Sequence, residues 1–447
     1  MVIHRTDRNR YVASASKGEI LAWCLYDWGN SAFATSVLAA VLPLYFAYIV
    51  PERGVRLGIP GGPGWNTQAA SLWAYAVSLS LVLVAVSSPV LGTIADRTAA
   101  KKRFLGFYAF LGALCTALLF SVHHGEVWRC LILFMLANIG FAGANVFYNA
   151  FLPQMVGLHR LDRISGRGFA FGYLGGGLLL ALNILMIQKP DLFGIPDRLT
   201  ATRLCFVSVG IWWALFTVPI LTLLHERPAL TGGMLHRSVL AYGFSRVMRT
   251  ISKATQFQQL LRFLIAYFIY NDGIQTVIVM ATIFGRTELE LGAGTLLGAL
   301  LMVQIVAIPG ALAFGRLAER LGAKKALMLS LIAWTGSVCY AFFMESAAEF
   351  MVIAALIGLI LGGSQAISRS LYARFVPLAH SAEFYGFYAV SNKFAAIPGP
   401  FLFGLLADLT GKIRVSILLL ALFFLTGLFL LATVDVEKGR QEALAAT

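Results

Sequence analysis

The segments GTIADRTAAKK (residues 92–102) and GRLAERLGAKK (residues 315–325) share one frame, in which a glycine, an alanine, an acid–arginine pair and two lysines recur without a gap. Each copy follows a long apolar run and forms a short basic turn. Two unrelated helices would seldom end in the same polar sequence. The repeat therefore predicts a chain built from two similar halves.

The composition around this repeat is that of a membrane protein. Of the 447 residues, 59% are hydrophobic and 13% are charged, whereas soluble domains carry about 25% charged residues. The formal net charge of +14 fits Lys and Arg collected in cytoplasmic loops. Nucleic acid is not expected as a partner, because no basic patch is interleaved with exposed aromatic residues. The five cysteines lie in or beside apolar runs and are expected to be buried.

The apolar runs predict the topology, since a helix needs roughly 20 residues to span a bilayer. Such runs occur at residues 20–50, 69–92, 104–122, 128–152, 168–188, 203–224, 258–284, 292–315, 326–344, 350–375, 384–407 and 415–434. We therefore predict an all-α integral membrane fold with about twelve transmembrane helices in two pseudo-symmetric six-helix bundles. With both termini cytoplasmic, 25 of the 35 Lys and Arg residues fall on the inner side and nine on the outer side.

The predicted domains follow from these runs. Residues 1–224 would form the N-terminal bundle and residues 257–447 the C-terminal bundle. Residues 225–256 between them are basic, with apolar and basic residues on different faces of a helix, so a surface helix on the cytoplasmic leaflet is expected. A solvated connector is the alternative. Residues 16–19, SKGE, have the form of a capping box that opens the first helix.

Polar residues inside the first run indicate a site. Asp27 lies 11 residues beyond Ser16, which is about 16 Å along a helix and near the bilayer middle. An ionised Asp there costs about 3 kcal/mol on insertion scales. The second half echoes this stretch, since YDWG at 26–29 resembles YNDG at 270–273. Arg369 and Lys393 are the buried cations that could offset Asp27 and Asp272. A static ion pair that only fixes helix packing is the alternative.

Further motifs connect the chain with a known family. The duplicated turn resembles the signature of the major facilitator superfamily. The stretches LYDWGNSAF (25–33), GGSQAISRS (362–370) and EFYGFY (383–388) resemble the autophagy-linked vacuolar amino-acid effluxers and their bacterial relatives. The resemblance covers essentially the whole chain and implies alternating access and export of neutral amino acids. One departure is Glu319, which stands where the first copy has Asp96.

In the superfamily's fold, the first, fourth, seventh and tenth helices face a central cavity, and these helices carry the polar stripes here. The candidate residues for substrate binding or coupling are Asp27, Asn30, Asn145, Asn149, Asn271, Asp272, Gln275, Gln365, Arg369 and Lys393. The alternative for the asparagines is hydrogen bonding between helices, worth about 0.6–2 kcal/mol. Four glycines of the fifth helix indicate close helix packing, and the segment PGP at 398–400 predicts a kink.

The repeated turns suggest a gate. We expect a charge-assisted latch between the bundles that breaks when the cavity opens inward. Its residues would be Gly92, Asp96, Arg97, Gly315, Glu319 and Arg320. A topology signal combined with helix capping is the alternative.

The function expected from these observations is secondary active transport of a small polar solute, most directly export of neutral amino acids with proton coupling. A drug, sugar or organic-anion exporter of the same fold, and a channel or non-transporting sensor, are the alternatives. An enzyme is not expected, because no motif couples a nucleophile to a base. We expect no cofactor and no metal, a monomer in the lipid bilayer, and a plasma membrane or vacuolar location.

Overall fold

The computed structural model describes residues 15–51, 55–58, 64–67, 69–226, 254–395, 398–410 and 412–446. This part of the chain is helical except for one antiparallel hairpin, in which β1 (Val55–Gly58) pairs with β2 (Gly64–Thr67). The basic surface helix expected between the halves falls almost entirely on residues 227–253, outside the described residues.

The helices of the first half follow the predicted runs. They are α1 (Lys17–Ala32), η2 (Phe33–Val41), α2 (Leu42–Ile49), α3 (Ala69–Thr98), α4 (Lys101–Leu118), η3 (Leu119–Ser121), α5 (Val127–Met155), η4 (Leu158–Arg160), α6 (Leu161–Gln188), η5 (Pro190–Phe193) and α7 (Arg198–Leu223). The first three are continuous, and η2 is a π-helical segment within this long first helix.

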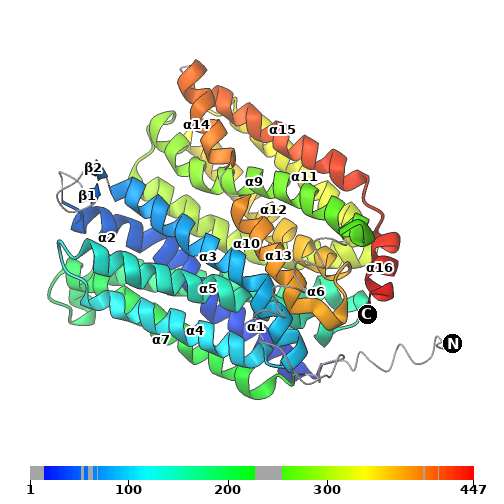
Figure 1. The fold of residues 1–447 in the computed structure, drawn as a ribbon. Helices are drawn as coiled ribbons and strands as arrows, with labels where there is room; N and C mark the ends of the chain where they lie inside the picture. Colours follow the sequence, from blue (N-terminus) through cyan, green and yellow to red (C-terminus); the bar gives the residue numbers. More distant parts are fainter. Residues whose placement is uncertain are drawn as a thin grey trace, which may run out of the picture.

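The second half has a matching series. Its helices are η6 (Ala254–Phe257), α9 (Gln258–Thr287), α10 (Ala293–Leu321), α11 (Ala323–Ala341), α12 (Ala347–Ala373), η7 (Leu378–His380), α13 (Ser381–Phe394), α14 (Pro398–Thr410), α15 (Ile413–Ala432) and α16 (Val436–Ala445). In both halves the helices run side by side between two ends of the molecule (Figure 1). We call the end where α1 begins and α16 lies the basic end, and the opposite end, where β1 and β2 lie, the hairpin end.

Within the described residues, ten helices are long and apolar enough to cross a membrane. Two of the expected runs are not among them. One is α11, a 19-residue helix whose first turn carries Lys324 and Lys325. The other is the run 384–407, which is divided into α13 and α14. Helix α14 begins at Pro398, within the PGP segment that predicts a kink.

The predicted start of α1 is confirmed. The Ser16 N–H donates to Glu19 Oε2 at 2.7 Å, and the Glu19 N–H donates to Ser16 Oγ at 3.2 Å. Together they form the capping box. Four of the five cysteines are buried as expected, whereas Cys339 is exposed.

Glycines allow helices to approach closely, as the contact of α4 with α5 shows. A Cβ on Gly140 would lie 2.6 Å from the Cα of Gly112 and 2.6 Å from the carbonyl oxygen of Tyr108. Both are backbone atoms, so no side-chain rotation can relieve the overlap. Helices in membranes associate through such small-residue contacts.

This packing gives a first prediction. Gly140→Ala is expected to destabilise the protein by about 1–3 kcal/mol, the usual cost of overpacking. Gly336→Ala in α11 is the matched control, because a Cβ there meets nothing within 4 Å. Thermal unfolding in detergent should show a lower Tm for the first variant alone. Equal Tm values for the two variants would contradict the contact.

Candidate functional site

The two halves meet at a buried arginine. Arg369 lies on α12 and is 3% exposed, and its guanidinium contacts three helices of the first half. Its Nε donates to Ser165 Oγ at 2.9 Å and its Nη2 donates to the Ser165 carbonyl oxygen at 2.8 Å. Its Nη1 donates to Asn149 Oδ1 at 3.3 Å and lies 3.6 Å from Asp27 Oδ2. The structure therefore brings three of the predicted residues together across the halves.

Aromatic rings enclose the same guanidinium. Arg369 Cζ lies 4.1 Å from the ring centroid of Phe169, 4.8 Å from that of Trp23 and 5.7 Å from that of Tyr148. Trp23 and Tyr148 stack with their centroids 4.5 Å apart, and the Trp23 Nε1–H donates to the Tyr148 carbonyl oxygen at 3.0 Å. We call this set the Arg369 cage; it consists of Trp23, Asp27, Tyr148, Asn149, Ser165 and Phe169.

Asp27 is only partly satisfied within the cage. Ser31 Oγ donates to Asp27 Oδ1 at 3.4 Å, and the Tyr148 hydroxyl and the Arg369 guanidinium lie beside the carboxylate, but among the described residues no hydrogen bond of good geometry reaches Asp27 Oδ2. Helix α6 packs closely here, since a Cβ on Gly172 would lie 2.7 Å from Ser31 Oγ and one on Gly168 would lie 2.8 Å from the arginine Nη2. The helix packing expected of the α6 glycines is therefore confirmed at the site itself.

Three further predicted residues extend this polar region. Asn30 on α1 donates from Nδ2 to Asn145 Oδ1 on α5 at 3.1 Å, within the first half. Gln365, one turn before Arg369 on α12, accepts at 2.6 Å from the Tyr173 hydroxyl on α6, so it also joins the halves. These contacts show that the polar stripes face one another.

The Asp272 carboxylate lies at the start of a helix of the second half. Its Oδ1 accepts the Gly399 N–H at 2.8 Å, at the start of α14, and a Cβ on Gly399 would overlap the Asp272 carboxylate and the Thr276 hydroxyl. The negative carboxylate therefore stabilises the positive end of a helix dipole. Among the described side chains, none forms an ion pair with Asp272. The Lys393 side chain is not among the described side chains, so its predicted pairing lies outside them.

The other predicted residues of α9 lie nearby. Asn271 donates from Nδ2 to Asn392 Oδ1 on α13 at 3.0 Å. Gln275 lies one turn after Asn271 and is half-buried. The predicted residues thus divide into two groups, one around Arg369 between the halves and one around Asp272 within the second half.

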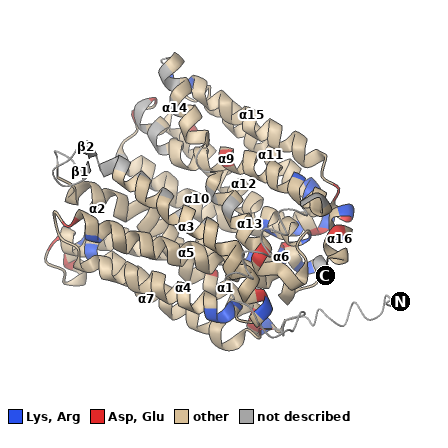
Figure 2. Ribbon diagram, in the orientation of Figure 1, with Lys and Arg blue, Asp and Glu red and all other residues tan. Residues whose placement is uncertain are grey.

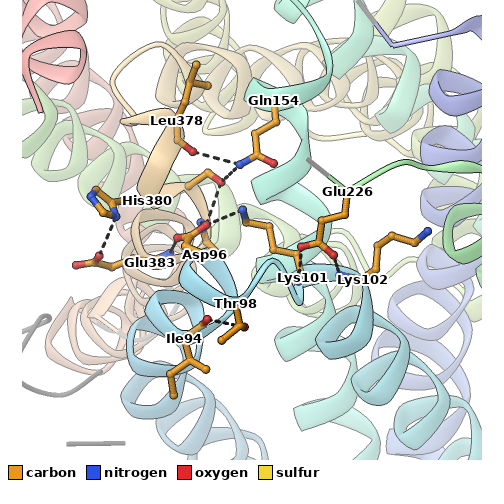
Figure 3. A network of polar contacts seen from close by, with 12 residues as sticks. Ile94, Asp96, Thr98, Lys101, Lys102, Gln154, Glu226, Leu378, His380 and Glu383 are labelled. Carbon is orange, nitrogen blue, oxygen red and sulfur yellow. Dashed lines mark hydrogen bonds and ion pairs between the residues drawn. The ribbon is translucent and has the colours of Figure 1, made fainter. Parts of the chain in front are cut away.

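The first repeated turn contacts the start of α13 at the basic end (Figure 3). Asp96 pairs with Lys101 Nζ at 2.7 Å and accepts the N–H groups of Ala382 at 3.2 Å and Glu383 at 3.0 Å. Gln154 on α5 donates to Ser381 Oγ at 3.0 Å. We call these six residues the Asp96 cluster. Asp96 therefore occupies the N-terminal end of a helix from the opposite half, where its charge is favourable.

Gly92 makes the Asp96 cluster possible. A Cβ at this position would overlap the Ala382 carbonyl oxygen, so only glycine lets α3 lie against the start of α13. Arg97, the last of the predicted latch residues on α3, is half-buried beside this contact.

The second repeated turn differs from the prediction. Glu319 and Arg320 are exposed, so they do not form the counterpart of the Asp96 cluster. Instead Asp162 on α6 pairs with Arg374 Nη2 at 2.5 Å and accepts from Ser370 Oγ at 2.6 Å. Both partners belong to the opposite half, and we call the three residues the Asp162 cluster. In the Asp162 cluster the carboxylate is supplied by α6. The contact therefore does not require a carboxylate from the turn after α10.

The glycine of the second turn keeps its expected place. A Cβ on Gly315 would lie 3.2 Å from the Asp162 carbonyl oxygen at the start of α6, as one on Gly92 would meet the start of α13. The two halves therefore contact each other at the basic end through two related surfaces.

Comparison with known proteins gives the family. A family model described as "Vacuole effluxer Atg22 like" matches residues 15–444. The chain belongs to this Atg22-like family. Among its relatives, an uncharacterized MFS-type transporter YxiO of Bacillus subtilis is 37% identical over 94% of this chain and 95% of the relative. Autophagy-related protein 22 of Kluyveromyces lactis is 26% identical over 98% of this chain and 97% of the relative.

Solved structures agree with the fold of an Atg22-like protein. The proton:xylose symporter XylE, a major facilitator superfamily protein, superposes with a TM-score of 0.71 at 15% identity over 98% of this chain and 99% of that one. The human organic anion transporter MFSD10 gives a TM-score of 0.67 at 14% identity, with 93% and 99% covered. This Atg22-like chain is thus an integral membrane protein of a transporter family and not an enzyme, as predicted.

Sequence reasoning about the Atg22-like chain missed Ser165, Asp162, Arg374 and Gln154. A second repeat could have indicated their neighbourhood, because the frame Val-x-Leu followed by glycine eight positions later occurs at 156–166 and at 376–386. This alignment places Asn149 opposite Arg369 and Gln154 opposite Arg374. All four aligned side chains contact the opposite half: Asn149 contacts Arg369, Gln154 contacts Ser381, and Arg374 contacts Asp162.

Proposed function

We propose that the protein exports neutral amino acids by alternating access of two six-helix bundles, residues 1–224 and 257–447, joined by residues 225–256. The basic end would face the cytoplasm, with both termini on that side. The distribution of charge supports this orientation, because Lys and Arg gather mainly at the basic end and few lie at the hairpin end (Figure 2).

The single observation that carries the proposal is the contact of Arg369 with α1, α5 and α6. A buried guanidinium from one half is held by a carboxylate, an amide and a hydroxyl of the other. Opposed charges of this kind suit a zwitterionic solute, whose carboxylate Arg369 would bind and whose ammonium group Asp27 would bind. Charges buried in a membrane are costly, and such residues usually mark a solute or ion pathway.

The gate contacts fit the same proposal. The Asp96 and Asp162 clusters both hold the halves together at the basic end. The state described here would therefore be closed toward the cytoplasm. Alternating access requires these contacts to break when the site opens to that side.

Counterflow in proteoliposomes tests the transport function directly. Vesicles loaded with a mixture of neutral amino acids should accumulate an external labelled amino acid transiently, and empty vesicles should not. A carrier saturates and shows counterflow, whereas a channel does not show it. If no neutral amino acid gives counterflow and a sugar, drug or organic anion does, the assignment of substrate is wrong.

Proton coupling is a separate part of the proposal. Asp27 and Asp272 are the buried carboxylates that could carry a proton through the membrane. An imposed pH gradient should then drive uptake against a concentration gradient, and Asp272→Asn should reduce this response. If the imposed pH gradient does not change the rate or extent of transport, proton coupling is excluded. Facilitated exchange of the solute would then be the mechanism.

A further inference from the structure

We propose that the Arg369 cage is a cation subsite, occupied in turn by the Arg369 side chain and by the ammonium or guanidinium group of the transported solute. The inference rests on the transport function proposed above, and it names the chemical group that a solute must carry. Arg369 would then act as a tethered occupant that the solute replaces.

The origin of the cage residues is the first argument. All six belong to α1, α5 and α6 of the first half, and only the cation comes from the second half. Separation of the halves would withdraw Arg369 and leave the complete cage behind. The cage residues have one hydrogen bond of their own to the second half, from Ser165 Oγ to the Ala366 carbonyl oxygen at 2.7 Å, and the other five do not need α12 to hold their positions.

The chemistry of the cage is the second argument. It offers four acceptors to a cation, namely the Asp27 carboxylate, the Asn149 amide oxygen, and the hydroxyl and carbonyl oxygens of Ser165. The faces of Phe169 and Trp23 add cation–π attraction, with centroids 4.1 and 4.8 Å from the guanidinium carbon. Carboxylate, carbonyl and aromatic faces together are the groups that recognise organic cations bearing N–H donors.

Unused hydrogen-bonding capacity is the third argument. Asp27 Oδ2 lies 3.6 Å from the nearest guanidinium nitrogen, beyond the roughly 2.7–2.9 Å of a charge-assisted hydrogen bond. Among the described residues no hydrogen bond of good geometry reaches this oxygen, and the buried Tyr148 hydroxyl lies beside the carboxylate. Arg369 thus fills the cage without saturating it, and a compact ammonium group could approach both atoms.

Competition for the cage would connect binding with movement. Arg369 and a bound cation cannot occupy the same position, so a solute that enters the cage removes one of the links between the halves. Binding of the solute in the cage and release of the Arg369 contact between the halves would then be one event. This gives the solute a differential interaction with the two states, as a conformational change requires.

The first test uses Arg369→Ala, which empties the cage in every state. Low-millimolar guanidinium or methylammonium should raise the Tm of the purified variant saturably, because a ligand that binds only the folded state stabilises it. Asp27→Ala added to this variant should weaken the effect at least about tenfold, as expected for loss of a hydrogen bond to a charged group.

Arg203→Ala is the matched control. Arg203 also lies over an aromatic ring, that of Phe120 at 4.7 Å, and donates to a carbonyl oxygen, but no cage surrounds it. Guanidinium should not raise the Tm of this variant or of the wild-type protein. A Tm of Arg369→Ala that does not respond, or that rises no more than those of the controls, overturns the proposal.

The second test uses the wild-type protein, so its result does not depend on whether a variant folds. A transported amine should inhibit counterflow at least about tenfold more strongly than its N-acetyl derivative, which lacks the charge. Equal inhibition overturns the cation subsite while transport itself stands. If no solute is transported at all, the proposed function fails, and the response of Arg369→Ala to guanidinium decides the cage alone.

Discussion

Arg369→Ala is expected to abolish transport, lowering the initial rate of uptake at least about a hundredfold. The substitution removes the cation that faces the first half and leaves Asp27 buried without its counter-charge. Breaking a buried pair in this way typically costs about 3–5 kcal/mol. Initial uptake into proteoliposomes, normalised to the amount of monodisperse protein, measures the effect.

Two variants make this result specific. Asp27→Asn keeps the shape of the side chain and removes its charge, and it should also lose transport if the carboxylate binds the solute. Arg414→Ala removes a different partly buried ion pair, with Glu288 at 3.1 Å, far along the chain from the cage. This variant should retain transport. If Asp27→Asn and Arg369→Ala both transport at the wild-type rate, the site is assigned wrongly.

Asp96→Ala is expected to open the basic end and to shift the equilibrium from the closed toward the open state about 10- to 100-fold. The change removes two hydrogen bonds from the start of α13 and the counter-charge of the buried Lys101. A hydrogen bond to a charged group contributes about 1.5–3 kcal/mol, which corresponds to that range.

Labelling of a cysteine placed in the gate measures this shift. Ser381→Cys is nearly isosteric and lies at a fully buried position in the Asp96 cluster. In a background with Cys339→Ser, a membrane-impermeant maleimide should label it faster when Asp96→Ala is added. Glu319→Ala is the control, because Glu319 occupies the equivalent place in the second repeat but is exposed. Equal acceleration by both variants would show that Asp96 does not hold the gate.

Much of the fold could be predicted because membrane helices are encoded locally. A run of about 20 apolar residues suffices to place a span, and the capping box and Pro398 place two boundaries. For the run 384–407, the sequence predicted a kink at residues 398–400 but did not predict two separate helices. The hydrogen bond that Asp272 accepts at the start of α14 could not be predicted, because Asp272 lies more than 120 residues earlier in the chain.

The site was predictable to the extent that burying a charge in a membrane is costly. The cost singles out Asp27, Asp272 and Arg369, because opposite charges that are buried in a membrane are expected to pair. Asp162 could not be found in this way, because a carboxylate at a helix end resembles an ordinary surface residue in sequence. The pairing of Asp162 with Arg374 joins residues 212 positions apart, which no local pattern encodes.

The contacts at the basic end recur in pairs that follow the internal repeat of the chain. A Cβ on Gly386 would meet the backbone of Pro89, and one on Gly166 would meet that of Ala311, in the same way that Gly92 and Gly315 approach the opposite helices. Contacts that recur in such pairs are those of an isologous interface, which two identical subunits form around a two-fold axis. The two halves thus meet as the protomers of a homodimer would. Their differences, such as Asn149 against Arg369, mark positions where only one half supplies a buried cation to the contact.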